Sequence, residues 1–178
     1  MSFAWSAKFE EGRIVFQNYP FSMPDLSEGI KVSEIEEISF GNPIELWLKN
    51  GDIVFFPVSC IHHLYEAQLE RPIRAIARYP VWELLLEPYL DTEFTAERRL
   101  VNKASLAACG FSDDEVAEIR EWTYPVKESN AWAWEWISLS LFDVLWVYRQ
   151  PFRLSFRKFP QVYQRAVAIA RRASESGD

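Results

Sequence analysis

The fold is decided first by residues 44–56, which read IELWLKNGDIVFF. Two runs rich in β-branched and aromatic residues, 44–49 and 52–56, meet across Asn50-Gly51. Asn-Gly between such runs favours a two-residue type I′ turn, because both turn residues must adopt positive φ. The stretch therefore predicts a β-hairpin with a type I′ turn.

Strand signals also dominate the chain before this hairpin. Glu11-Gly12 reads as a turn into a strand at residues 13–16, and prolines and polar residues mark a loop at residues 19–27. Two short apolar groups follow within residues 30–40. The first part of the chain is therefore expected to form a small antiparallel sheet.

Helical spacing takes over after the hairpin. Residues 59–69 are expected to form a short helix, with one apolar stripe made of Ile61, Leu64, Tyr65 and Leu69. Residues 73–78 fit either a further strand or an extension of this helix. Residues 81–90 again show helical spacing of their apolar side chains.

Capping residues mark two more helices. Thr95 is expected to cap a helix that runs to Ala108 and buries Leu100 and Leu106, and Gly110 stands in the usual position after a helix. Ser112 and Glu115 then match the capping box of a new helix. A last helix is expected over residues 161–173.

Residues 131–148 read AWAWEWISLSLFDVLWVY and form the most apolar stretch. Its length is close to the lower limit for a membrane span, but Glu135 and Asp143 would each cost about 3 kcal/mol at the centre of a bilayer. The stretch therefore predicts a buried helix, over residues 128–148, rather than a membrane span.

The order of these elements, strands first and helices afterwards, predicts an α+β fold. We expect an antiparallel β-rich domain with one helix over residues 1–78. A helical domain with a basic, aromatic C-terminal segment is expected over residues 79–178.

Composition excludes several classes of protein. The 178 residues contain two cysteines, too few for a disulfide scaffold, and the start of the chain has no basic and apolar run typical of a secretory signal. These features favour a cytoplasmic protein. The net charge of −7 argues against a nucleic-acid binder.

No motif in the sequence specifies an enzyme or a cofactor. Phosphate-binding glycine loops, the nucleophile elbow and the zinc-protease motif do not occur. His62 and Glu66 would share one face of a helix, but His62 and His63 are the only two histidines, so a metal site would lack a third histidine. We therefore expect no cofactor and no metal, and favour a protein that is not an enzyme.

Charge is distributed unevenly along the chain. Residues 1–148 carry 24 acidic and 12 basic side chains, whereas residues 149–178 carry 2 acidic and 7 basic ones. Basic and aromatic residues alternate at the start of this last segment, and they are candidates for contact with a partner. The candidates are Phe152, Arg153, Phe156, Arg157, Lys158 and Phe159.

Three interpretations of the basic segment stay open. It can pack on the acidic body of its own chain, with aromatic side chains at the edge of the core. It can contact a protein partner, including a second copy of the chain in a homodimer. It can also bind an anionic membrane, although its charge is modest.

Acidic residues also recur at helical spacing. Glu83, Glu87 and Asp91 lie four residues apart, which predicts a solvated helix face or an acidic dock for the basic segment. Glu135 and Asp143 lie in the apolar stretch. Three alternatives are expected for them: a polar site in the helical core, one exposed face, or ion pairs with Arg98, Arg99 or Arg149.

Two classes of function are favoured over membrane binding. The first is a non-enzymatic protein-interaction module, either an adaptor or an immunity-type protein that neutralises a basic toxin. The second is a small-ligand-binding protein or enzyme with a Trp-lined pocket in the helical region. The residues expected around that pocket are Trp132, Glu135, Trp136, Asp143 and Trp146.

Overall fold

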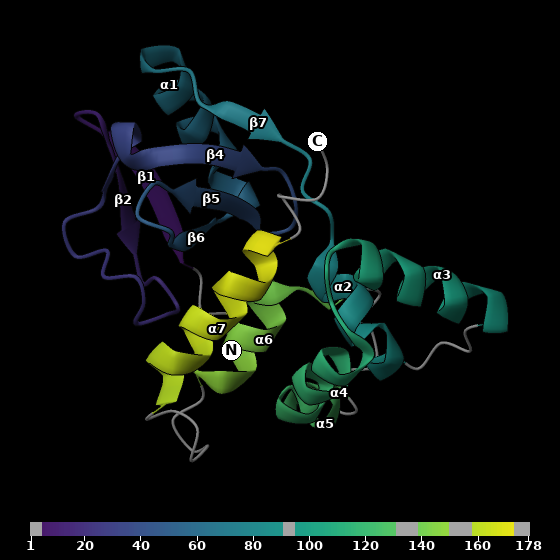
Figure 1. The fold of residues 1–178 in the computed structure, drawn as a ribbon. Coiled ribbons are helices and arrows are strands. Elements are labelled where there is room, and N and C mark those ends of the chain that lie inside the picture. Colours follow the sequence, from purple (N-terminus) through teal and green to yellow (C-terminus); the bar gives the residue numbers. More distant parts are fainter. Residues whose placement is uncertain (1–4, 91–94, 131–138, 150–157, 173–178) are drawn as a thin grey trace. The chain divides into compact units, whose positions relative to one another are not determined.

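The computed structural model describes residues 5–90, 95–130, 139–149 and 158–172 (Figure 1). The chain divides into two compact units, Met1–Ala77 and Arg78–Asp178, here named the β unit and the helical unit. Strands and one α-helix build the first unit, and helices build the second. The α+β fold class expected from the sequence is confirmed.

The β unit contains two sheets. One is antiparallel, with strand order β1-β2-β3, and the other has the order β6-β5-β4-β7. Strand β7 pairs in parallel with β4, so residues 74–76 form a strand and do not extend the preceding helix. The elements are β1 (Ser6–Glu10), β2 (Arg13–Gln17), β3 (Ile30–Lys31), the 3₁₀ turn η1 (Val32–Glu34), β4 (Ile35–Ser39), β5 (Ile44–Leu48), β6 (Ile53–Phe56), η2 (Val58–Cys60), α1 (Ile61–Glu70) and β7 (Arg74–Ile76).

Residues 44–56 form the expected hairpin of β5 and β6, but the type I′ turn was wrong. Gly51 has a φ of +99°, whereas the φ of Asn50 is not positive. Leu48 N donates to Asp52 O (2.9 Å) and Gly51 N donates to Leu48 O (3.0 Å), which defines a three-residue loop closed by glycine. The side chain of Asn50 stabilises this loop, because its Oδ1 accepts from Asp52 N (3.0 Å) and its Nδ2 donates to Asp52 Oδ2 (2.8 Å).

The backbone of a type I′ turn occurs instead between β1 and β2. Glu10 pairs with Arg13, so Glu11 and Gly12 form a two-residue loop. Their φ values are +49° and +75°, the left-handed conformation that this turn requires at both positions.

Helix α1 packs on β1 and β2, and only one side of it is buried. Leu64 and Ala67 are inaccessible to solvent, whereas Tyr65 is exposed and Leu69 is 87% exposed. The predicted stripe was therefore wrong for Tyr65 and Leu69. Five positions turn a helical side chain most of the way to the opposite face, so Leu69 cannot reach the sheet that covers Leu64.

The helical unit contains six α-helices and one 3₁₀ turn among its described residues. They are α2 (Val81–Leu86), η3 (Glu87–Tyr89), α3 (Ala96–Ala108), α4 (Asp113–Trp122), α5 (Tyr124–Asn130), α6 (Leu141–Tyr148) and α7 (Phe159–Arg172). None of the helices within the described ranges combines the length and apolar character that crossing a bilayer demands.

The predicted caps of α3 and α4 are confirmed. Thr95 Oγ1 accepts from Arg98 N and Ser112 Oγ accepts from Glu115 N, both at 3.2 Å. Gly110 between the helices has a φ of +79°. Such caps depend on residues only three positions apart, so they are readable without knowledge of the tertiary fold.

The predicted burial of α3 was half right. Leu106 is buried, but Leu100 is 68% exposed. Leu106 follows Leu100 by six positions, which places the two side chains on different sides of α3, and α2 packs on this helix.

The predicted single helix over residues 128–148 was wrong. Helix α5 is described over Tyr124–Asn130, and α6 begins at Leu141. Ser140 between them is extended, with φ −121° and ψ 178°, and forms a capping box with Asp143. Asp143 Oδ2 accepts from Ser140 N (2.7 Å) and from Ser140 Oγ (2.8 Å), so a helix start lies inside the apolar stretch.

Helix α7 completes the core of the helical unit. It packs on α6 and α2, and Trp82 Nε1 donates across this contact to Ala166 O at 3.2 Å. A second buried hydrogen-bond group lies near α4, where Tyr89 donates to the Arg120 carbonyl and its hydroxyl is 3.1 Å from Thr123 Oγ1. These bonds tie α2, η3, α4 and α7 into one body.

Candidate functional site

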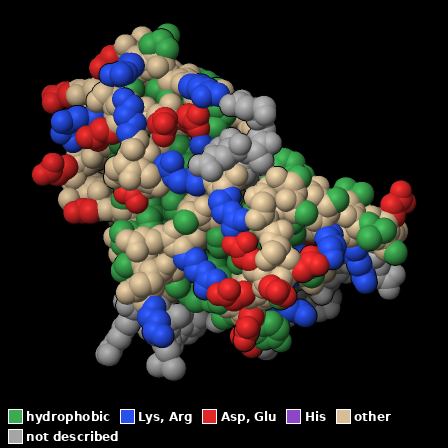
Figure 2. Space-filling view, in the orientation of Figure 1, with side chains coloured by type: hydrophobic (Ala, Val, Ile, Leu, Met, Phe, Trp, Pro, Cys, Tyr) green, Lys and Arg blue, Asp and Glu red, His purple; other side chains and the backbone are tan. Residues whose placement is uncertain are grey.

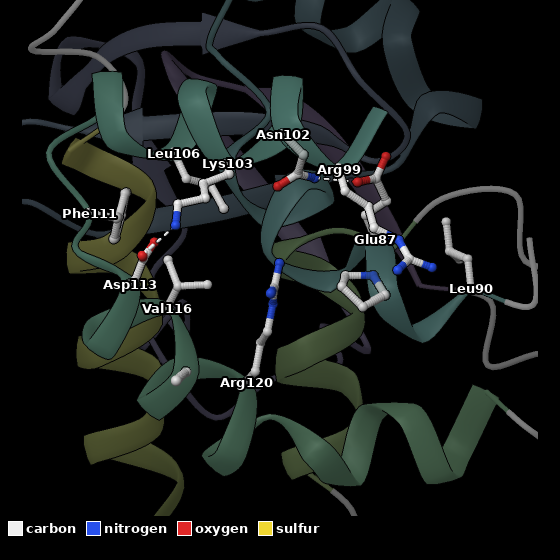
Figure 3. Close-up of a pocket in the computed structure, with 12 residues that line it drawn as sticks. Glu87, Leu90, Arg99, Asn102, Lys103, Leu106, Phe111, Asp113, Val116 and Arg120 are labelled. Carbon is white, nitrogen blue, oxygen red and sulfur yellow. Dashed lines mark hydrogen bonds and ion pairs between the residues drawn. The ribbon is translucent and has the colours of Figure 1, made fainter. Parts of the chain in front are cut away.

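A cavity of about 570 Å³ opens between η3, α3 and α4 of the helical unit (Figure 3). Apolar side chains line part of its wall, with Leu106 and Phe111 buried and Val116 half-buried. Ligand pockets in proteins usually measure about 300–1,000 Å³ and combine an apolar wall with a few polar groups. The cavity therefore has the size and the wall of a ligand site.

Glu87 and Asn102 form the buried polar side of the cavity. Glu87 is only 7% exposed, and its two carboxylate oxygens are used by different donors. Oε1 accepts from Arg98 Nε at 2.9 Å, and Oε2 accepts from Asn102 Nδ2. Asn102 Nδ2 also donates to Leu84 O at 3.0 Å. Glu87 is thus a fixed structural anion, and the predicted solvated face is wrong at this residue.

Arg120 reaches into the cavity from α4, between the Glu87 side and the Lys103 side (Figure 3). Its Nε donates to Leu85 O at 2.9 Å, which fixes the side chain. Burial lowers the pKa of Arg120, and its neighbours Tyr89 and Glu87 act in the opposite direction. Among the described residues, no carboxylate forms an ion pair with Arg120. Its terminal nitrogens therefore face the cavity as a partly desolvated cation.

An ion pair joins the two helices on the other side of the cavity. Lys103 Nζ of α3 lies 2.5 Å from Asp113 Oδ2 of α4 (Figure 3). With Arg99, Lys103 and Arg120 against Glu87 and Asp113, the lining carries a net charge of +1, although the whole chain carries −7.

Arg172 of α7 holds the turn between α3 and α4. Its guanidinium donates to the Gly110 carbonyl and to the Glu115 carboxylate, and lies 3.9 Å from the centre of the Phe111 ring. The ring is thereby fixed in the cavity wall by a cation–π contact.

The Trp-lined pocket expected from the sequence falls largely outside the described residues. Trp132, Glu135 and Trp136 lie there, and only Asp143 and Trp146 are described. Asp143 is buried at the start of α6, where burial raises its pKa and the hydrogen bonds from Ser140 lower it. The Trp146 ring stacks on the Arg149 guanidinium at 3.5 Å. Neither residue is among those that line the cavities of about 570, 310 and 250 Å³ in the described ranges.

Most candidate partner contacts also lie outside the described residues, namely Phe152, Arg153, Phe156 and Arg157. Of the remaining two, Lys158 is exposed, whereas Phe159 is 2% exposed and belongs to the core of the helical unit.

The described part of the basic segment pairs with the chain's own acidic residues. Arg165 Nη2 lies 2.7 Å from Glu118 Oε1, and Arg172 pairs with Glu115, so two arginines of α7 contact α4. The basic and aromatic run at residues 150–157 lies outside the described residues, so these ion pairs concern α7 alone.

The histidines do not form the pair considered from the sequence. His63, rather than His62, contacts Glu66, with 2.8 Å between Nδ1 and Oε2. The described residues contain no cluster of three or more His, Cys, Asp or Glu side chains suited to a metal ion. Smaller cavities, of about 310 and 250 Å³, are lined by described residues of the β unit.

Sequence reasoning missed the cavity of the helical unit. One signal was available, since Arg99, Asn102, Lys103 and Leu106 share one face of α3 and mix charge with apolar character. That face alone does not indicate a ligand site, because Arg120 and Phe111, which complete the site, lie opposite it in other parts of the chain. Comparison with protein-family models, with curated proteins and with solved structures found no match for this chain.

Proposed function

We propose that this protein binds a small organic ligand in the helical unit and does not transform it. The observation that carries the proposal is the cavity of about 570 Å³ with buried Leu106 and Phe111 on its wall and Arg120 inside it. The polar groups support binding better than catalysis. Both oxygens of Glu87 are engaged, and Asp113 is paired with Lys103.

A ligand screen with a blocked variant tests this proposal. Ala117 is exposed and lines the cavity, so Ala117→Phe introduces bulk into the cavity without disturbing the core. Ala168→Phe is the matched control, because Ala168 is also exposed, on α7, but does not line the cavity. We expect compounds that raise the melting temperature of the wild-type protein and of Ala168→Phe, but not that of Ala117→Phe. Hits that stabilise all three proteins equally would refute binding in this cavity.

A second candidate function is the interaction module, and the outer face of α3 favours it. Leu100 is 68% exposed and Val101 56% exposed, and Ala104 and Ala108 continue the same face. In the space-filling view, hydrophobic side chains are visible along the projecting α3 (Figure 2). The partner we propose is a second copy of the chain, because in an antiparallel pair the bulky residues of one α3 would face the alanines of the other.

Sedimentation velocity distinguishes this second function. A dimer of the wild-type protein that dissociates on Leu100→Glu, but persists in Ala117→Phe, is expected. A monomer at all accessible concentrations would exclude it.

A further inference from the structure

The cavity of the helical unit contains more cations than its own carboxylates neutralise. Lys103 is paired with Asp113, and Glu87 is engaged by Arg98 and Asn102. The guanidinium of Arg99 and the terminal nitrogens of Arg120 form no ion pair with any carboxylate in the described ranges. The site is thus built with donors that an acceptor from outside can use.

Arg120 is the stronger of these two donors. It is half-buried and held by Leu85 O at 2.9 Å, whereas Arg99 is exposed at the rim. A guanidinium fixed through Nε keeps its two terminal nitrogens in a plane suited to a carboxylate. Little side-chain entropy would be lost on binding, since the arginine is already held in place.

The charge of the cavity selects the charge of its ligand. The lining alone carries +1, and Arg98, which pairs with Glu87 from outside the lining, is 60% exposed and screened by solvent, so the balance complements one negative charge. The Glu87 carboxylate is near enough to Arg120 to influence the arginine's ionisation, so it would repel the second charge of a phosphate monoester. A singly charged group fits this balance better than a doubly charged one.

The wall of the cavity selects the rest of the ligand. Leu106, Phe111 and Val116 face the same space as Arg120, from α3, the α3–α4 turn and α4 (Figure 3). Each square ångström of apolar surface that a ligand buries against them contributes about 25 cal/mol, so an apolar body adds affinity that a bare ion lacks.

We propose, building on the ligand-binding function above, that the cavity binds a monocarboxylate with an apolar body, the carboxylate on Arg120 and the body against Leu106 and Phe111. Two sources can supply this chemistry, a free organic acid and the C-terminal end of an apolar peptide.

Isothermal titration calorimetry with matched probes tests the proposal. The probes are octanoate, 4-phenylbutyrate, their primary amides, inorganic phosphate, and a Leu-Leu-Phe tripeptide as the free acid and as the C-terminal amide. We expect each acid to bind about tenfold or more tightly than its amide, because charge-assisted hydrogen bonds are roughly twice as strong as neutral ones. Phosphate is expected to bind more weakly than the acids.

Four variants assign this preference to Arg120. Arg120→Gln should remove the preference for acid over amide, and Arg120→Lys should retain part of it, since lysine keeps the charge but not the planar pair of donors. Arg99→Gln, at an exposed position, should reduce it slightly. Arg165→Gln is the matched control, because Arg165 pairs with Glu118 outside the cavity. Circular dichroism and the melting temperature confirm that each variant is folded.

The outcomes separate this inference from the function on which it rests. Acids and amides that bind equally, and that Ala117→Phe excludes, would overturn the inference and leave ligand binding intact. Binding of none of the probes would also overturn it, and the blocked-variant screen then decides the broader function. Tighter binding of the tripeptide acid than of the free acids would support the inference and identify a chain terminus as the source.

Discussion

Replacement of Glu87 by alanine tests the central polar group of the helical unit. Glu87 is 7% exposed and accepts hydrogen bonds from Asn102 and Arg98, which both belong to α3. Alanine removes both bonds, whereas Asn102 keeps its bond to the Leu84 carbonyl. Asn102 is therefore not left without an acceptor, and the loss is limited to the two bonds of the carboxylate.

The two bonds should contribute unequally. The Asn102 bond is buried and involves a charged acceptor, which is worth about 1.5–3 kcal/mol. The Arg98 side chain is 60% exposed, so its ion pair contributes only about 0–1 kcal/mol. We expect Glu87→Ala to lower the free energy of unfolding by about 2–3 kcal/mol, and Glu87→Gln, which keeps an acceptor, by about 1 kcal/mol.

Urea unfolding followed by tryptophan fluorescence measures this loss. Six of the eight tryptophans lie in the helical unit, so the signal reports mainly on that unit. Double-mutant cycles should give a coupling energy above about 1 kcal/mol between Glu87 and Asn102, and below about 0.5 kcal/mol between Glu87 and Arg98. The reasoning fails if Arg98 shows the larger coupling, or if Glu87→Ala leaves the stability unchanged.

Four further substitutions, in three experiments, test other parts of the fold. Gly12→Ala should cost about 1 kcal/mol, because an L-residue is strained at a φ of +75°, and thermal unfolding measures the loss; an unchanged melting temperature would contradict the turn. Leu106→Ala should cost about 2–4 kcal/mol and Leu100→Ala less than about 0.5 kcal/mol, so equal losses in urea unfolding would disprove the assignment of faces on α3. Burial raises the pKa of Asp143 above its ordinary 3.8, so the stability of the wild type relative to Asp143→Asn should be greatest below that value and fall as the pH rises through the raised pKa; a pH-independent difference between pH 3 and pH 7 would exclude this effect.

Local signals in the sequence predicted much of this fold. The caps at Thr95 and Ser112 and the glycine at position 110 depend on residues three or fewer positions away, and all three occur as expected. The hairpin of β5 and β6 was also predicted, but the side chain of Asn50 selected another turn. A side chain and the backbone can compete for the same hydrogen bonds, and the outcome determines the turn type. That outcome depends on three-dimensional geometry that the sequence alone does not give.

The faces of helices were less predictable, for a different reason. Leu69 and Leu100 fit apolar stripes, yet both are exposed. Periodicity shows that a helix has an apolar side, but it does not show how wide the neighbouring sheet or helix is. The same limit applies to Glu87, whose burial depends on Arg98 and Asn102 from the next helix.

The ligand cavity could not be predicted from the sequence, because residues of three separate elements form its wall. Arg120 and Leu106 are fourteen positions apart in the sequence and belong to different helices. Aromatic enrichment drew attention to Trp132 and Trp136 instead, which lie outside the described residues. Composition indicates that a chain can form pockets. Which polar group lies inside a pocket depends on how the elements pack together.

The hydrogen bond from Trp82 to the Ala166 carbonyl has a consequence for synthesis in the cell. The two residues are 84 positions apart, so at about 5–20 residues per second the ribosome needs roughly 4–17 seconds to deliver the acceptor after the donor. Pairing of β4 with β7 in the β unit spans only residues 37–76, and that unit can close while α7 is still being translated. Throughout this interval the side of α2 that packs on α7 lacks its cover, so the nascent helical unit exposes apolar surface for longer than the β unit does.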